Sequence, residues 1–172
     1  RLTRGVADAA PQYSPKGDCV AFLRADEQGT RQVFVLPVGG GEAVQATDAI
    51  GGVTAFAWSP DAGTPAFTAR VPEHGRYGTV EGLDAAHESP RRITGIRWHD
   101  NGLGYSADRR AHVFVIDAPD LTAEPQYEVA ASAGVDGSAA PARRVAAVAR
   151  QLTTDDGSYA HVAFAPSGRE IY

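Results

Sequence analysis

The feature of this sequence that most restricts its fold is a short pattern that recurs along the chain. An aromatic residue is followed by a turn rich in Ser, Pro, Asp and Gly, and then by an apolar run. The first two copies are "PQYSPKGDCVAFLR" at 11–24 and "AFAWSPDAGTPAFTA" at 55–69. Trp58 stands 45 positions after Tyr13, its counterpart in the first copy. A period of this length is typical of repeat architectures.

Two weaker copies follow. In "GIRWHDNGLGYSA", Trp98 is the aromatic residue, and Asp100-Asn101-Gly102 is the turn, 40 positions after the second copy. In "HVAFAPSGREIY", Phe164 is the aromatic residue, and 66 positions separate it from Trp98 because extra chain intervenes. A second marker, which ends in Thr, runs in phase with the pattern. It reads "RLT" at 1–3, "VQAT" at 44–47, "RRIT" at 91–94 and "RQLT" at 150–153.

The residue types between these markers indicate strands joined by turns. Val, Ile, Phe, Tyr and Thr gather in the short runs, whereas Gly, Pro, Asp and Ser gather between them. Pro after Ser presets the backbone for a turn, and the following Asp or Gly tolerates the dihedral angles that the turn needs. The sequence therefore predicts an all-β chain, a partial β-propeller of four-stranded antiparallel blades with about three and a half blades.

This prediction treats residues 1–172 as a fragment of one propeller domain. An ordinary β-sandwich is the alternative, which the two in-phase markers make less favourable. Irregular insertions are expected at 71–90 and 121–148, where the alternating pattern is lost. The predicted units are 4–47, 48–94, 95–153 and an incomplete 154–172.

The aromatic-Ser-Pro turn followed by "VAFLR" or "PAFTAR", and then "QVFVLPVGGGEAVQAT", resembles the propeller repeats of TolB-type proteins and of the prolyl oligopeptidase family. The passage from "RVPEHGRYGT" to "RRITGIRWHDNGLGYSADRRAHVFVIDAPD", with "RRIT" as a strand, is closer to the acylaminoacyl-peptidase and dipeptidyl-aminopeptidase-like branch of that family. In that branch an amino-terminal propeller covers a carboxy-terminal α/β-hydrolase domain. The resemblance implies a non-catalytic segment of a cytoplasmic serine peptidase that gates and orients peptide substrates for a hydrolase domain outside this chain.

The chain itself carries no recognisable catalytic triad. The Gly-x-Ser-x-Gly motif that holds the family's nucleophile is missing from the sequence. The histidines are scattered, and none stands in a motif that pairs it with Ser and Asp. We therefore assign no catalytic residue, and only His74 and Arg76 are candidates for substrate gating, because related peptidases place loops of this kind near the hydrolase. The histidines are His74, His87, His99, His112 and His161.

The composition fits this interpretation. A formal net charge of −5 argues against a nucleic-acid partner. No apolar stretch is long enough to span a membrane, and no signal peptide is visible. Neither a cofactor nor a metal site is expected, because the "HDN" at 99–101 occupies a turn of the repeat. Cys19, the only cysteine, is expected to be a small core residue.

A second hypothesis is a TolB-like propeller that serves only as a platform for protein interactions. The chain lacks Met, opens on the end of a marker and stops inside a repeat, so it is expected to be a piece of a longer protein. An open arc of blades would leave sheet faces and strand edges uncovered. Self-association of the isolated piece is therefore expected.

Overall fold

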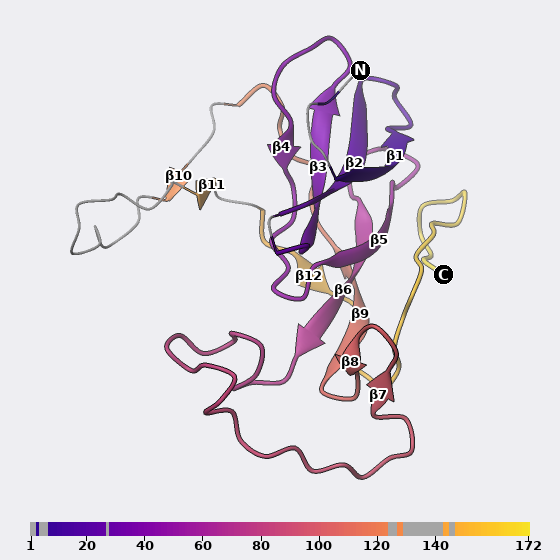
Figure 1. Ribbon diagram of the computed structural model, residues 1–172. Helices are drawn as coiled ribbons and strands as arrows, with labels where there is room; N and C mark the ends of the chain where they lie inside the picture. Colours follow the sequence, from indigo (N-terminus) through magenta and orange to yellow (C-terminus); the bar gives the residue numbers. More distant parts are fainter. Residues whose placement is uncertain (1–2, 4–6, 27, 124–126, 129–142, 145–146) are drawn as a thin grey trace, which may run out of the picture.

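The computed structural model describes residues 3, 7–26, 28–123, 127–128, 143–144 and 147–172. This part of the chain contains strands, turns and loops but no helix, which confirms the all-β prediction. It accordingly offers no helical segment with the length and apolar character needed to cross a bilayer. Two four-stranded antiparallel sheets dominate the structure (Figure 1).

The first sheet is built from consecutive strands, each paired with the next. Its strands are β1 (Asp8–Tyr13), β2 (Cys19–Ala25), β3 (Arg31–Pro37) and β4 (Val44–Gln45). They pair in the order β1-β2-β3-β4, and every pair is antiparallel. The first copy of the turn pattern joins β1 to β2, as its sequence predicted.

The second sheet has the same meander order but long insertions between its strands. Its order is β5-β6-β9-β12, again antiparallel throughout. The second copy of the turn pattern joins β5 to β6, which confirms the predicted hairpin. The strands are β5 (Val53–Ala57), β6 (Ala66–Pro72), β9 (Arg109–Val115) and β12 (Arg150–Gln151).

Two pairs of short strands are inserted between the strands of this second sheet. The third copy of the turn pattern forms only the hairpin of β7 (His99–Asp100) and β8 (Gly104–Tyr105), between β6 and β9. A further pair, β10 (Tyr127–Glu128) and β11 (Arg143–Arg144), lies between β9 and β12. The rest of the predicted insertion at 121–148 falls largely outside the described residues.

The second sheet combines strands of two of the predicted units, whose boundaries stay a prediction. The second sheet takes β5 and β6 from the unit 48–94 and β9 and β12 from the unit 95–153. The "RRIT" segment at 91–94, expected to be a strand, is an irregular loop in which Thr94 is exposed. No strand of the described structure pairs with this segment. The number of blades stays a prediction.

A buried serine organises the turn in each of the first two copies. Ser59 donates its hydroxyl hydrogen to Asp61 at 2.5 Å and accepts the N–H of Thr64 at 2.9 Å. Ser14 donates in the same way to Asp18, at 2.6 Å. These hydrogen bonds lower the pKa of both aspartates. Ser-Pro therefore recurs because its hydroxyl ties the turn to the start of the return strand.

The Thr marker has an equally definite role at the outer edge of each sheet. Thr47 Oγ1 accepts the N–H of Val33 on β3 at 2.9 Å, and Thr153 Oγ1 accepts that of Val113 on β9 at 3.0 Å. The glutamine two residues earlier donates its amide to the threonine carbonyl at 2.7 Å in both sheets, and these residues are Gln45 and Gln151. Gln-x-Thr thus ends both sheets with matching hydrogen bonds.

Replacing Thr47 by valine should lower the free energy of unfolding by about 1 to 3 kcal/mol, because it leaves the buried Val33 N–H without its acceptor. Thr47 is 1% exposed, whereas Thr153 is only half-buried, so Thr153→Val should cost less. Urea unfolding of both variants measures the difference. Thr47→Ser, which keeps the hydroxyl, is the control. Equal stability of Thr47→Val and the unsubstituted chain would contradict this role.

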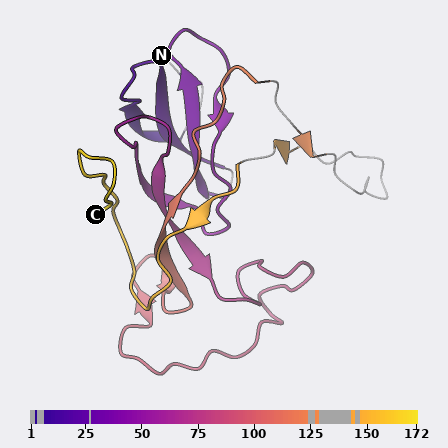
Figure 2. The same cartoon turned by 180° about the vertical axis from the view of Figure 1, so that it is seen from behind.

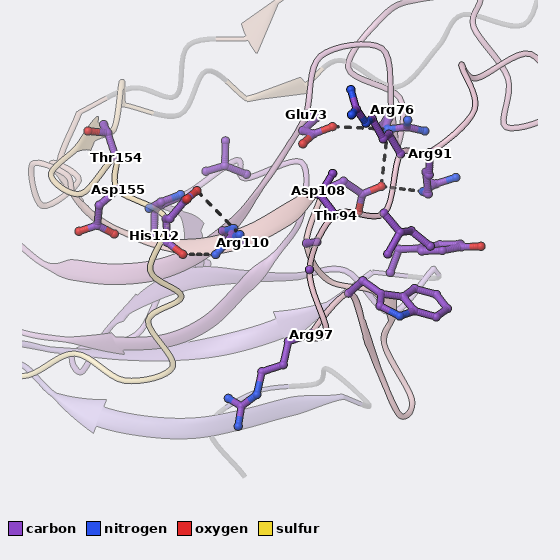
Figure 3. Close-up of a pocket in the computed structure, with 18 residues that line it drawn as sticks. Glu73, Arg76, Arg91, Thr94, Arg97, Asp108, Arg110, His112, Thr154 and Asp155 are labelled. Atoms are coloured by element: carbon purple, nitrogen blue, oxygen red, sulfur yellow. Dashed lines mark hydrogen bonds and ion pairs between the residues drawn. The ribbon is translucent and has the colours of Figure 1, made fainter.

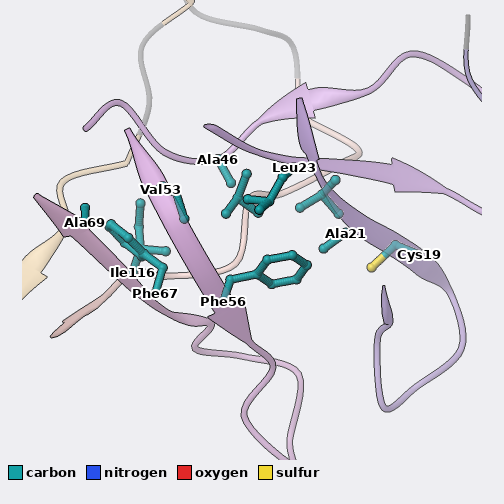
Figure 4. Packing of buried hydrophobic residues seen from close by; sticks show 11 residues of the cluster. Cys19, Ala21, Leu23, Ala46, Val53, Phe56, Phe67, Ala69 and Ile116 are labelled. Carbon is teal, nitrogen blue, oxygen red and sulfur yellow. The ribbon is translucent and has the colours of Figure 1, made fainter. Parts of the chain in front are cut away.

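The main core lies between the two sheets (Figure 4). Side chains alternate between the faces of a strand. Cys19, Ala21 and Leu23 therefore point from one face of β2 toward Phe56 and Phe67 of the second sheet. Cys19 is 7% exposed, which confirms its predicted place in the core, and burial raises the pKa of its thiol.

The opposite face of the second sheet is covered by the C-terminal segment, which Figure 2 shows from behind. Ala66 and Val113 pack there against Val162, with Phe164 at the edge of the cluster. The turn of the fourth copy lies against that of the second, since a Cβ built on Gly168 would stand 3.4 Å from Pro60. The second sheet is therefore packed on both faces.

Candidate functional site

The two gating candidates lie in the loop that follows β6, but the structure gives them different environments. His74 is exposed. Arg76 is only 8% exposed and lines a cavity, which His74 does not. The loop is fastened to the second sheet, since Glu73 donates its N–H to the carbonyl of Asp108 just before β9 at 2.8 Å. The structure thus does not bring His74 and Arg76 together as one site.

Arg76 is held by three carboxylates. Its guanidinium lies 3.5 Å from Glu88. It also lies 3.6 Å from Asp108 and 3.7 Å from Glu73, and Figure 3 marks both of these contacts. The Glu88 and Asp108 side chains are each about one-tenth exposed, whereas that of Glu73 is largely in solvent. A buried cation needs such partners because desolvation otherwise makes its charge costly. The surroundings of Arg76 are therefore those of a structural ion pair.

Arg91 completes this ion cluster. Its Nε donates to Asp108 at 2.7 Å and its Nη2 to Glu88 at 3.1 Å. Burial opposes the charge on Arg91, but the bond to Asp108 and the nearby Tyr77 outweigh it, so its pKa is raised. The backbone N–H of Tyr77 bonds Glu88 at 2.9 Å and, together with the nearby arginines, lowers the pKa of that carboxyl. The four charged side chains, Arg76, Glu88, Arg91 and Asp108, form one network.

Aromatic rings stack against the arginines beside this network. The guanidinium of Arg91 lies 4.3 Å from the ring centroid of Tyr105, and that of Arg109 lies 4.4 Å from the ring of Tyr77. Trp98 packs on Tyr105, with ring centroids 5.5 Å apart. Because an arginine stacks well on an aromatic face, these contacts hold the β7–β8 hairpin against the loop.

A cavity of about 480 Å³ opens between the ion cluster and the end of the second sheet. On its far side, β9 contributes Arg110 and His112, and the segment after β12 contributes Asp155 (Figure 3). Asp156 of the same segment also lines the cavity. Arg110 donates to the carbonyl of Asp156 and lies 3.8 Å from its carboxylate. The hydroxyl of Tyr159 donates to Asp155 at 2.7 Å and lowers the pKa of that carboxyl.

Charged and aromatic side chains are prominent in the described lining of this cavity. Its described lining contains neither serine nor cysteine. His112, the histidine that lines it, is 8% exposed and places Nδ1 3.2 Å from the hydroxyl of Thr153. Within the described ranges, His, Cys, Asp and Glu form no group of three that could hold a metal ion. The cavity instead offers arginines and aromatic rings.

The "HDN" segment at 99–101 lies at the tip of the β7–β8 hairpin, as the turn interpretation predicts. His99 and Asp100 belong to β7, and the Asp100 carbonyl accepts the N–H of Leu103 at 3.2 Å. Gly102 has a φ of 77°, a left-handed conformation that favours glycine. The Asp100-to-Leu103 bond closes the turn.

Comparison with known proteins finds a relative by sequence and a neighbour by structure that are both peptidases. The chain is 26% identical over 106 residues, 62% of its length, to the uncharacterized peptidase YuxL of Bacillus subtilis (strain 168). Its fold is similar to that of the Pyrococcus horikoshii acylaminoacyl peptidase, with a TM-score of 0.48 and 19% identity over 64% of the chain. No protein-family model matches the chain.

Each match covers only a small part of the relative. The sequence match spans 16% of the Bacillus protein, and the structural match spans 15% of the Pyrococcus chain. The sequence similarity supports a relationship between this chain and a peptidase.

Proposed function

We propose that this chain is a segment of the propeller of a serine peptidase, and that it gates and orients peptide substrates for a C-terminal α/β-hydrolase domain. The proposal rests on a repeated structure: both sheets have the same serine turn and end in the same Gln-x-Thr hydrogen bonds. The sequence match to a peptidase adds to it. Repeated four-stranded units that pack face to face are the building principle of propellers. The fourth copy of the pattern packs on the other face of the second sheet, where the proposal expects the next unit.

In this proposal Arg76 acts as a positioning residue. Its charge is already shared among three carboxylates, so it holds the loop from β6 toward Arg91 in place rather than contacting a peptide itself. His74, exposed on the same loop, is the member of the pair that is accessible to a substrate. A fixed loop restricts entry by size, since a loop that opens admits larger substrates.

The test is peptidase activity of the full-length parent on chromogenic aminoacyl and acyl-aminoacyl substrates, with this chain assayed beside it. Activity in the parent and none in the chain is expected. In the parent, Arg76→Met should raise the rate on long peptides relative to short ones, because the loop loses its anchor. Arg169→Met, at an exposed position far along the chain, is the control. An inactive parent, or unchanged size selectivity in the Arg76 variant, would count against the proposal.

A further inference from the structure

The charged side chains that line the cavity beside the ion cluster differ in whether they have a partner. Every acidic side chain that lines it has a partner within the described structure. Glu73 and Asp108 contact Arg76, and Asp156 contacts Arg110. Asp155 accepts a hydrogen bond from a tyrosine hydroxyl. The acidic side chains of the cavity are therefore already satisfied.

Two arginines that line the cavity have no such partner. Arg92 and Arg97 line the same cavity, are exposed, and make neither a hydrogen bond nor an ion pair with any other described residue. Figure 3 shows the Arg97 side chain apart from both ion-paired groups. Among the charged side chains that line the cavity, these two arginines are the ones that have neither a hydrogen bond nor an ion pair in the described structure. Clustered positive charge in a concave site attracts an anion and raises its local concentration.

The shape and lining of the cavity specify the anion further. Trp98 and the exposed Ile93 give apolar surface beside the two free arginines, and Tyr105 stacks under Arg91. A carboxylate matches the planar fork of a guanidinium and forms two parallel hydrogen bonds with it. A volume of about 480 Å³ admits a short stretch of peptide beside that carboxylate.

We propose that this cavity binds a carboxylate of a peptide, and that Arg92 and Arg97 hold it while Trp98 contacts the adjoining side chain. The identification of the ligand as a peptide rests on the proposed function, whereas the preference for a carboxylate rests on the unpaired arginines. The ion cluster fixes one wall beforehand, so binding does not have to order that wall. The carboxylate belongs either to an acidic side chain or to the C-terminus of the peptide.

Calorimetric titration of this chain with three acetylated peptides tests the proposal. The first, Ac-Ala-Glu-Ala-amide, carries only a side-chain carboxylate, and the second, Ac-Ala-Ala-Ala, carries only a C-terminal one. The third, Ac-Ala-Ala-Ala-amide, is neutral. At least one of the first two should bind, more weakly as salt rises, and the neutral peptide should not. Which of them binds identifies the source of the carboxylate.

Arg92→Gln and Arg97→Gln should each weaken that binding about tenfold, because each removes a charge-assisted hydrogen bond. Arg169→Gln, which changes an exposed arginine outside the cavity, should bind as the unsubstituted chain does. Equal binding of the neutral peptide, or undiminished binding in the Arg92 and Arg97 variants, would overturn the proposal. If the chain binds a carboxylate but the full-length parent has no peptidase activity, the carboxylate site is supported and the proposed peptidase function is wrong. If the parent is an active peptidase but the chain binds no carboxylate, the proposed function is supported and the carboxylate site is wrong.

Discussion

Replacing Phe67 by alanine should lower the free energy of unfolding by about 3 to 5 kcal/mol. Phe67 is 2% exposed and lies in the core between the two sheets, with its ring stacked 5.3 Å from that of Phe114. Truncation removes buried apolar surface and leaves a cavity that strands on both sides cannot fill. Urea or thermal unfolding of the variant measures the loss.

Two variants make this result specific to the core. Phe67→Leu keeps most of the volume and should lose clearly less stability than the alanine variant. Tyr13→Ala removes another aromatic ring, but one that is 65% exposed, and should change the free energy of unfolding by no more than about 0.5 kcal/mol. Similar losses for Phe67→Ala and Tyr13→Ala would show that the sheets do not pack through Phe67.

Replacing Arg76 by methionine should cost about 3 to 5 kcal/mol, because it removes one partner from a buried ion pair and leaves excess negative charge. Glu88 and Asp108 would then share only Arg91. Methionine keeps an unbranched chain in the same space, so the loss reports on charge rather than on packing. The free energy of unfolding, measured at neutral pH, tests this expectation.

The matched control is Arg169→Met, since Arg169 is exposed and its side chain has no hydrogen bond or ion pair among the described residues. The double variant Arg76→Met with Glu88→Gln should lose less stability than the two single losses added together, because the second change removes the carboxylate that the first one stranded. Strict additivity would mean that Arg76 and Glu88 do not interact in solution.

The inner hairpins could be predicted because their turns are local. Everything that shapes the turn at Ser59 lies within five residues of it, and the same holds at Ser14, so a short pattern contains the whole signal. The Thr marker was visible in the same way at 44–47 and 150–153. The sequence did not show that the threonine hydroxyl accepts a backbone hydrogen bond at the end of a sheet, as Thr47 does from Val33 on β3.

The third copy shows where a local pattern stops being sufficient. Its turn forms, but β7 and β8 are two residues each and find no further strand beside them. The marker "RRIT" likewise lacks the glutamine that precedes Thr47 and Thr153, and Thr94 is exposed. Gln-x-Thr, rather than a terminal Thr alone, is the signal that distinguishes a sheet-closing copy.

The ion cluster could not be predicted from the sequence. Its members Arg76, Glu88, Arg91 and Asp108 lie in an irregular segment without periodicity, and their distances depend on how that segment folds back on β9. Family resemblance pointed to Arg76 but gave it a role toward substrate. The unpaired Arg92 and Arg97 stand out only after every other charge around the cavity has been given its partner.

The long insertions of the second sheet affect the order in which the chain can assemble. At the β2–β3 turn the paired residues Ala25 and Arg31 are six positions apart, whereas Pro72 and Arg109 of β6 and β9 are 37 apart. Because of the loss of chain entropy, closing the longer loop is roughly 1.5 kcal/mol less favourable than closing the β2–β3 turn. At a synthesis rate of roughly 5 to 20 residues per second, β9 begins to emerge roughly 2 to 7 s after β6 has been made. The first sheet can be complete by then. Its apolar face is therefore available for the nascent β5–β6 hairpin to pack against while the edge of β6 that later pairs with β9 is still unpaired.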